Sequence, residues 1–156
     1  VCMSPVGLEH GEIAIDVAFA LKTFADAHRL GRVSAETGFK LAEDPDIVRA
    51  PDVSFVTAGR RPAGAGRRRF VDGAPDLAVE VMSPDDREKD LLAKAGEYLD
   101  AGAARVWLVR PAMRSVTVFR AGGEVTTRHE TDVLTSDDAG FAAEGFTLAV
   151  AAIFAE

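Results

Sequence analysis

The sequence predicts a mixed α/β fold, an α+β arrangement in which a central mixed sheet is flanked by α-helices. The order of elements is the first observation: a long helix, several strands, a buried strand, a second helix and another buried strand follow one another. A strand, a helix and a strand in succession normally form a right-handed parallel crossover. The second observation is size, because 156 residues with 47% apolar side chains suffice for one core. We therefore expect a single domain over residues 1–156.

The first half of the chain is predicted to form one long helix and three strands. Apolar side chains recur at mostly three- and four-residue intervals in the helical part, and Gly31 is placed to end it. Two short stretches around Gly38 are typical of a hairpin. The predicted elements are a helix at 8–28, strands at 32–37 and 39–42, a turn at 44–46 and a strand at 51–56.

The second half is predicted to hold two buried strands around a helix, and then a hairpin. The strand from Leu77 to Met82 is apolar on both faces, which is typical of a central strand covered on two sides. Ser83 and first-turn acids favour a helix after it, and Gly102 ends that helix. The predicted elements are a strand at 77–82, a helix at 86–101, a strand at 104–110, hairpin strands at 115–120 and 124–129, and a tail at 146–154 that is either a strand or a short helix.

The composition limits which cellular location and which partners we expect for the chain. The single cysteine, Cys2, excludes a disulfide framework and a cysteine-rich zinc site, so we expect a reducing, cytoplasmic location. No apolar run reaches the ~18 to 20 residues that a membrane-spanning helix needs, so no membrane partner is expected. The three histidines, His10, His28 and His129, are too scattered for a zinc site, and we expect them to be ordinary surface or interface residues.

The charge of the chain is unevenly distributed. The formal net charge of -7 argues against a protein that coats nucleic acid by electrostatics alone. A solvated loop and a phosphate-contacting loop are both open interpretations of one acid-free Gly/Pro/Ala segment, and its place between two acid-bearing strands favours the second. The arginines of this segment, our candidates for contact with nucleic acid, are Arg60, Arg61, Arg67, Arg68 and Arg69.

A carboxylate in the middle of an apolar strand is the most informative feature of the chain. An ionised Glu80 in that strand is costly unless a cation or hydrogen-bond donors compensate it. A second acid, Asp52, opens the strand at 51–56. On the following helix, Lys94 shares one stripe with Asp90 and Tyr98, four residues to either side. Two carboxylates and a lysine are the minimum equipment for metal-assisted phosphodiester hydrolysis, so the sequence predicts such a site.

Structural roles for the same residues are the alternative. Glu80 and Lys94 could form a buried ion pair, and Asp52 could cap a turn after a proline. Asp76 is a rival to Asp52, since it also follows a proline. Its place on the same strand as Glu80 would, however, give one-sided metal coordination.

Several segments together resemble the Uma-two family of restriction-endonuclease-like proteins. The resemblance covers about Met3 to Arg120 and lies in the order and spacing of four motifs. These are Pro51-Asp52-Val53-Ser54-Phe55-Val56, the run from Pro75 to Pro84 around Glu80, the four-residue spacing of Asp90, Lys94, Tyr98 and Gly102, and Val106-Trp107-Leu108-Val109.

The resemblance implies the PD-(D/E)XK nuclease superfamily, with its restriction-endonuclease-like core. It implies that Asp52 and Glu80 are metal-binding acids for Mg²⁺ or Mn²⁺, that Lys94 is the basic catalytic residue, and that Tyr98 is its companion on the helix. Met82 stands where the superfamily pattern has a lysine, and in this family a lysine on the following helix takes over that role. Family members also carry a strand and a Glu-bearing turn before the segment 2–5, so we expect that this chain lacks a short N-terminal segment.

Two functions are therefore carried forward. The first is a magnesium-dependent endonuclease that acts on nucleic acid, with DNA as the expected partner. The second is a catalytically inactive module of the same fold that binds nucleic acid or protein. The alternating edge-strand character of residues 115–129 also suggests pairing across the axis of a homodimer.

Overall fold

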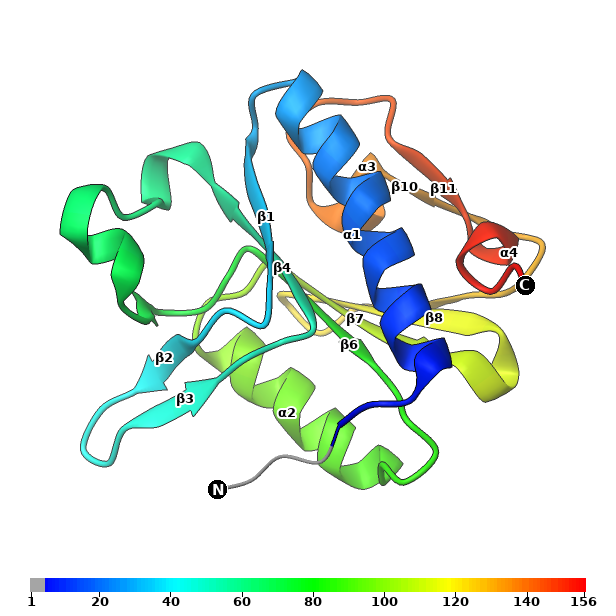
Figure 1. Ribbon diagram of the computed structural model, residues 1–156, viewed down its shortest axis with the longest axis horizontal. Coiled ribbons are helices and arrows are strands. Elements are labelled where there is room, and N and C mark those ends of the chain that lie inside the picture. Colours follow the sequence, from blue (N-terminus) through cyan, green and yellow to red (C-terminus); the bar gives the residue numbers. More distant parts are fainter. Residues whose placement is uncertain (1–4) are drawn as a thin grey trace.

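The structure is a computed structural model that describes residues 5–156, so the part of the resemblance at Cys2, Met3 and Ser4 lies outside the described residues. A six-stranded mixed sheet forms its centre (Figure 1). Only the two central strands, β6 and β7, are parallel, and all other neighbours are antiparallel. In sheet order the strands are β1 (Gly31–Ala35), β4 (Val53–Thr57), β6 (Leu77–Val81), β7 (Arg105–Arg110), β8 (Ser115–Arg120) and β9 (Val125–Arg128). The predicted mixed α/β fold is confirmed.

Two helices cover opposite faces of the sheet. Helix α1 (Leu8–Ala27) packs its buried Val17 and Leu21 against one face. The side chains of alternate β6 residues, among them Val79, point toward this helix. Helix α2 (Glu88–Asp100) packs Tyr98 against the other face, where Ala78 of β6 lies. Because side chains alternate along a strand, β6 is covered on both sides, and all five of its residues are buried.

Smaller elements surround this core. A three-stranded sheet in the order β3 (Ile47–Arg49), β2 (Phe39–Ala42) and β5 (Val71–Asp72) extends beside the main sheet. The long loop between β4 and β5 leads into this small sheet. It contains the short 3-10 turns η1 (Ala58–Arg60) and η2 (Gly64–Arg68), and it projects from the molecule at the upper left of Figure 1. The remaining elements are η3 (Pro111–Met113), β10 (Val133–Thr135), α3 (Ser136–Ala139), β11 (Thr147–Ala149) and α4 (Val150–Ile153).

Most predicted elements have their expected type. The crossover from β6 through α2 to β7 is parallel, and the hairpin of β8 and β9 forms as predicted. The tail at 146–154, left open between strand and helix, forms both β11 and α4. Asp44-Pro45 forms the predicted turn between β2 and β3.

Two predictions near the first helix are wrong. The stretches around Gly38 do not pair with each other, because β1 pairs with β4 in the main sheet while β2 pairs with β3 and β5. Gly31 does not end α1, which stops at Ala27. Gly31 instead begins β1, where an added Cβ would lie 2.1 Å from the carbonyl oxygen of Val56.

Within residues 5–156 every helix is too short or too polar to cross a membrane.

Candidate metal and nucleic-acid site

The pairing of β4 with β6 brings the two predicted acids together. Val53 is paired with Val79 in this antiparallel ladder, so one further step places Asp52 opposite Glu80. Residues directly opposite each other on antiparallel strands have Cβ atoms about 4.5–5.5 Å apart. The strand register thus brings together two acids that twenty-seven residues of sequence separate, at the place where β4 begins and β6 ends.

Glu80 is held between two side chains of α2. Its side chain is only 9% exposed. The hydroxyl of Tyr98 donates a hydrogen bond to Oε1 at 2.8 Å, and Nζ of Lys94 lies 4.0 Å from Oε2. Burial raises the pKa of Glu80 from 4.5 to about 7; Lys94 and Tyr98 oppose this rise and the charge of Asp52 adds to it. One ammonium group at this distance therefore leaves the charge of the carboxylate incompletely compensated.

Asp52 is fixed by the backbone of β6 and by α1. Its Oδ2 accepts a hydrogen bond from the amide of Val81 at 2.7 Å, and Nε2 of His10 lies 3.3 Å from the same oxygen. Burial raises the pKa of Asp52 above its ordinary value, against the opposing effects of Val81, His10 and Lys94. Among the described residues, Oδ1 of Asp52 receives no hydrogen bond, which leaves one carboxylate oxygen available to a ligand.

His10 belongs to this site, and the expectation that it is an ordinary surface residue is wrong. Its side chain is only 11% exposed, and its Nδ1 is buried without a hydrogen-bond partner in the described part of the chain. The first turn of α1 brings it to Asp52 across forty-two positions of sequence. A lone histidine on a polar helix face carries no local signal for such a contact.

Three further residues that the sequence analysis considered, Asp90, Asp76 and Met82, form no hydrogen bond or ion pair with the acid pair through their side chains. Asp90 is exposed on the first turn of α2 and has no side-chain bond to Glu80 or Lys94. Asp76 lies at the opposite end of β6, where it accepts the amide of Thr57 at 2.8 Å and pairs with Arg60 at 2.9 Å. This is a structural role, so Asp76 does not compete with Asp52. Met82 lines an apolar pocket of about 440 Å³ just beyond Glu80.

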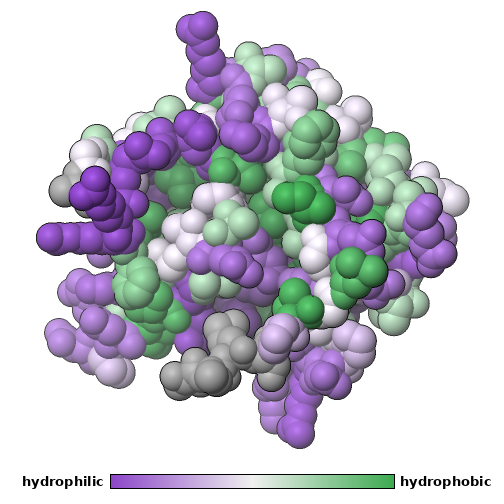
Figure 2. Space-filling model, viewed as in Figure 1, coloured by the Kyte–Doolittle hydropathy of each residue, from purple (hydrophilic) through white to green (hydrophobic). Residues whose placement is uncertain are grey.

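The arginine-rich loop divides into an anchoring residue and a basic pocket. Arg60 is used internally, since it also donates to the carbonyl of Ala74 at 2.7 Å. Figure 2 shows strongly hydrophilic side chains gathered on the side of the molecule where this loop lies in Figure 1. We define the arginine pocket as a hollow of about 220 Å³ whose polar lining is Arg32, Ser34, Thr37, Arg61, Arg67 and Arg69.

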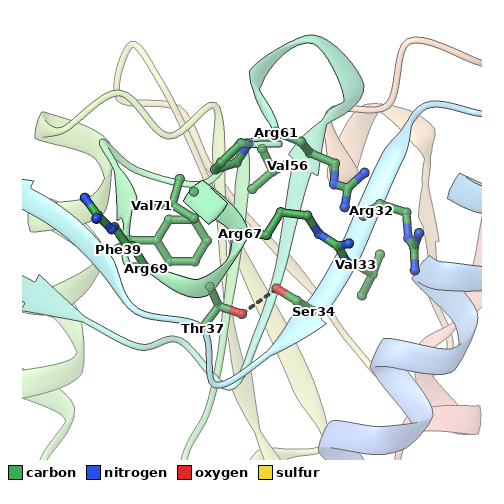
Figure 3. Close-up of a pocket in the computed structure, with 12 residues that line it drawn as sticks. Arg32, Val33, Ser34, Thr37, Phe39, Val56, Arg61, Arg67, Arg69 and Val71 are labelled. Carbon is green, nitrogen blue, oxygen red and sulfur yellow. Dashed lines mark hydrogen bonds between the residues drawn. The ribbon is translucent and has the colours of Figure 1, made fainter. Parts of the chain in front are cut away.

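The arginine pocket combines guanidinium groups with hydroxyls. In Figure 3 Arg32, Arg61 and Arg67 extend toward the same region, and the hydrogen bond of 2.7 Å from Thr37 to Ser34 lies beneath them. Arg32 of β1 pairs with Val56, four residues along β4 from Asp52. At about 3.4 Å per residue, the pocket lies about 14 Å from the acid pair, or about four base-pair steps of B-form DNA.

Comparison with known proteins identifies a family and a solved structure of similar fold. The chain is similar to the crystal structure of a protein described as a "putative nuclease belonging to DUF820" from Anabaena variabilis, with a TM-score of 0.80 and 20% identity over 97% of this chain and 83% of that one. At this identity the likeness establishes the fold. Among curated proteins, none matches the chain. A family model described as "Putative restriction endonuclease" matches residues 1–151, and the chain therefore belongs to that family, Uma2.

Proposed function

We propose that the chain is a metal-dependent nuclease of the PD-(D/E)XK type, which hydrolyses phosphodiester bonds in nucleic acid, with DNA as the first substrate to test. One observation carries the proposal: the buried carboxylate of Glu80 and the partly buried carboxylate of Asp52 stand side by side, and both have a raised pKa. Two neighbouring acids with a single ammonium group, 4.0 Å from Glu80, form an environment that a cation would complete. Membership of the family supports the same conclusion.

The donor set fits a hard divalent cation. Mg²⁺ prefers carboxylate oxygens, keeps several of its waters and needs only one or two carboxylates from the protein. Asp52 and Glu80 would hold it, and no cluster of three or more His, Cys, Asp or Glu side chains suited to a metal occurs in the described residues. When bound, such an ion polarises a phosphate and lowers the pKa of water. The buried Nδ1 of His10 has no hydrogen-bond partner among the described residues, so this nitrogen is also available to a ligand at this end of the sheet.

Lys94 supplies the positive charge that the protein itself contributes. Its side chain is 37% exposed, so the ammonium group reaches both Oε2 of Glu80 and the solvent in front of it. From there it would offset negative charge on a phosphorane and orient a water molecule. Tyr98 keeps Glu80 in place through its 2.8 Å hydrogen bond, and its own pKa is raised by burial and by the charge of Glu80. We therefore assign Lys94 a catalytic role and Tyr98 a positioning role.

The loop arginines are the proposed contacts to the phosphate backbone. Arg61, Arg67, Arg68 and Arg69 have no carboxylate within 4.0 Å among the described residues, so their charges are available to a ligand. Arg60 instead holds the loop to Asp76 and Ala74. In a chain of net charge -7, a local basic pocket would direct a polyanion to one place on the surface. A cytoplasmic location and a homodimer built on the edge strand β9 remain part of the proposal.

A plasmid-nicking assay with Mn²⁺ tests the first prediction. We expect Asp52→Asn, Glu80→Gln and Lys94→Met each to reduce the cleavage rate by about 100-fold or more, because each removes a charge that acts on the transition state. Glu97→Gln is the matched control, since Glu97 lies on the same helix but pairs with Arg49 at 2.7 Å outside the site. Absence of any Mn²⁺-dependent rise in melting temperature would remove the basis of the proposal.

A binding module without activity is the second candidate, and Met82 is the observation that favours it. The thioether of Met82 occupies the position where the superfamily pattern places a catalytic lysine, and it faces an apolar pocket. If Mn²⁺ raises the melting temperature while neither single- nor double-stranded substrates are cleaved, this second function replaces the first.

A further inference from the structure

We propose that Phe70 is a stacking platform for one unpaired nucleobase, next to the arginine pocket, and that the nucleic acid bound at this place is single-stranded. This inference rests on the proposed function in one respect, that the ligand is a nucleic acid. It adds the class of strand and a residue that selects it.

Phe70 is a large apolar side chain displayed among cations. It is 60% exposed and directly follows Arg67, Arg68 and Arg69 in sequence. A phenylalanine that served only the core would lie buried, as Phe39 of the neighbouring strand does at 0% exposure. The exposed ring therefore offers an aromatic surface to solvent in a strongly basic setting.

The backbone of Gly38 supports the Phe70 ring, which is otherwise largely exposed. A Cβ added to Gly38 would lie 2.6 Å from Cδ1 and 2.9 Å from Cε1 of Phe70, so the ring rests directly on the glycine backbone. The amide of Val71 donates to the carbonyl of Gly38 at 2.9 Å, and Val71 pairs with Phe39 in the sheet of β2 and β5. An aromatic ring that already rests on the backbone loses little further entropy when a ligand stacks on it.

The ring borders a second hollow, which shares one lining residue, Arg69, with the arginine pocket. This hollow, of about 510 Å³, is lined by Lys40, Arg68, Arg69, Phe70 and Asp72. Arg69 lines both hollows, and in Figure 3 it lies on the opposite side of Phe39 from Arg32, Arg61 and Arg67. A phosphate site and an aromatic site joined by one arginine match the two ends of a nucleotide.

The charges around the ring favour a polyanion that carries bases. Arg68 and Arg69 have no carboxylate partner within 4.0 Å among the described residues, whereas Lys40 shares its charge with Glu43 and Asp46 at 3.9 and 3.6 Å. Base stacking on an aromatic ring beside a positive groove is the usual way in which proteins hold single strands. Bases of a duplex stack on each other and are not available to such a ring.

Fluorescence anisotropy with labelled oligo-dT in EDTA tests the inference on the full chain. We expect Phe70→Ala to weaken binding of the single strand by about 5- to 150-fold, the range for loss of one stacked base, and to leave duplex binding unchanged. Phe70→Trp should retain wild-type affinity. Phe19→Ala is the matched control, because Phe19 is 71% exposed on α1 and lines neither of the two hollows. Oligo-U in place of oligo-dT distinguishes RNA from DNA as the source of the base.

Two outcomes would overturn the inference. Unchanged single-strand affinity in Phe70→Ala shows that the ring does not stack, and equal losses for single strand and duplex show that it only shapes the loop. Equal melting temperatures of wild type and variant establish that the variant is folded. Because the assay contains no metal, loss of nicking activity with retained Phe70-dependent binding contradicts the proposed catalysis alone. Normal nicking with Phe70-independent binding contradicts the stacking platform alone.

Discussion

At the scale of single residues, the surroundings of an acid determine what it can do. Glu80 has one strong donor, the Tyr98 hydroxyl, and one ammonium at 4.0 Å, in a place where burial strongly disfavours its charge. Exposed ion pairs contribute little in water, but a buried acid with incomplete compensation must bind a proton or a cation. The same acid on an exposed helix surface would have neither tendency.

Tyr98 gives a direct optical test of this environment, because it is the only tyrosine in the chain. Burial, then the charge of Glu80, raise its pKa far above the ordinary value of 10.0. In an alkaline titration we expect the native protein to show no tyrosinate absorbance until it unfolds, whereas the denatured chain titrates near the ordinary value. A native-state transition near that value would mean that the hydroxyl faces water and does not hold Glu80.

Sequence reasoning identified some of these residues and missed others for a physical reason. Glu80, Asp52 and Lys94 could be found because a charge inside or beside an apolar strand conflicts with its surroundings. His10 could not, since its role arises only when the first turn of α1 lies beside the start of β4. A polar residue on a helix face conflicts with nothing until the tertiary structure forms.

At the scale of elements, the most extensive polar network lies at α3, and sequence patterns gave no sign of it. Asp138 is fully buried and accepts hydrogen bonds from Arg120 at 2.8 Å, from Arg128 at 3.0 and 3.2 Å, and from the amide of Thr135 at 2.9 Å. Its burial alone would raise its pKa, but the hydrogen bonds from Arg128 and Thr135 outweigh this and hold it below 3.8. A four-residue helix is thus fixed to β8 and β9.

Removal of this acceptor should destabilise the fold severely. We expect Asp138→Ala to lower the free energy of unfolding by about 3–5 kcal/mol, because the buried guanidinium of Arg120 loses its one fully buried carboxylate partner. Asp137→Ala is the control, since Asp137 also contacts Arg120 but its side chain is 72% exposed, and its loss should cost about 1 kcal/mol or less. Urea unfolding of the two variants measures the difference. Equal effects would mean that burial adds nothing to the network.

Pairing partners were harder to predict than element types. The stretch 32–42 has the residues of two strands around a glycine, yet Ser34 pairs with Ser54 and Phe39 pairs with Arg49 and Val71. Local sequence determines whether a segment extends, whereas long-range packing determines which strand lies beside it. The hairpin around Gly122-Gly123 was predictable because its two strands alternate over a short loop, and both glycines adopt positive φ.

At the scale of the whole molecule, the sheet separates two regions of opposite charge. The acids cluster where β4 begins and β6 ends, and the basic pocket lies about 14 Å away at the other end of β4. The strand between them joins a place suited to a cation to a place suited to a phosphate. The order of strands and the apolar pattern predicted the sheet, but the distance between these regions depends on register, which the sequence alone did not reveal.

The acid pair should also control how the stability of the whole fold depends on pH. A carboxyl with a folded-state pKa of about 7 and an ordinary value of 4.5 binds its proton more tightly in the folded protein. Its contribution to stability is therefore complete below the ordinary value and is lost as pH rises through about 7. For Glu80 this amounts to about 3 kcal/mol. The raised pKa of Asp52 acts in the same direction, whereas the lowered pKa of Asp138 matters only in more acidic solution.

Chemical denaturation without metal at about pH 5 and about pH 8 measures this last effect. We expect the free energy of unfolding of wild type to fall over this interval and that of Glu80→Gln to fall much less, since the neutral amide can still accept the hydrogen bond from Tyr98. Mn²⁺ at the higher pH should restore the lost stability in wild type but not in Glu80→Gln, because only wild type has two ionised carboxylates that can bind the cation. Parallel pH profiles for the two proteins would show that Glu80 is compensated without a metal.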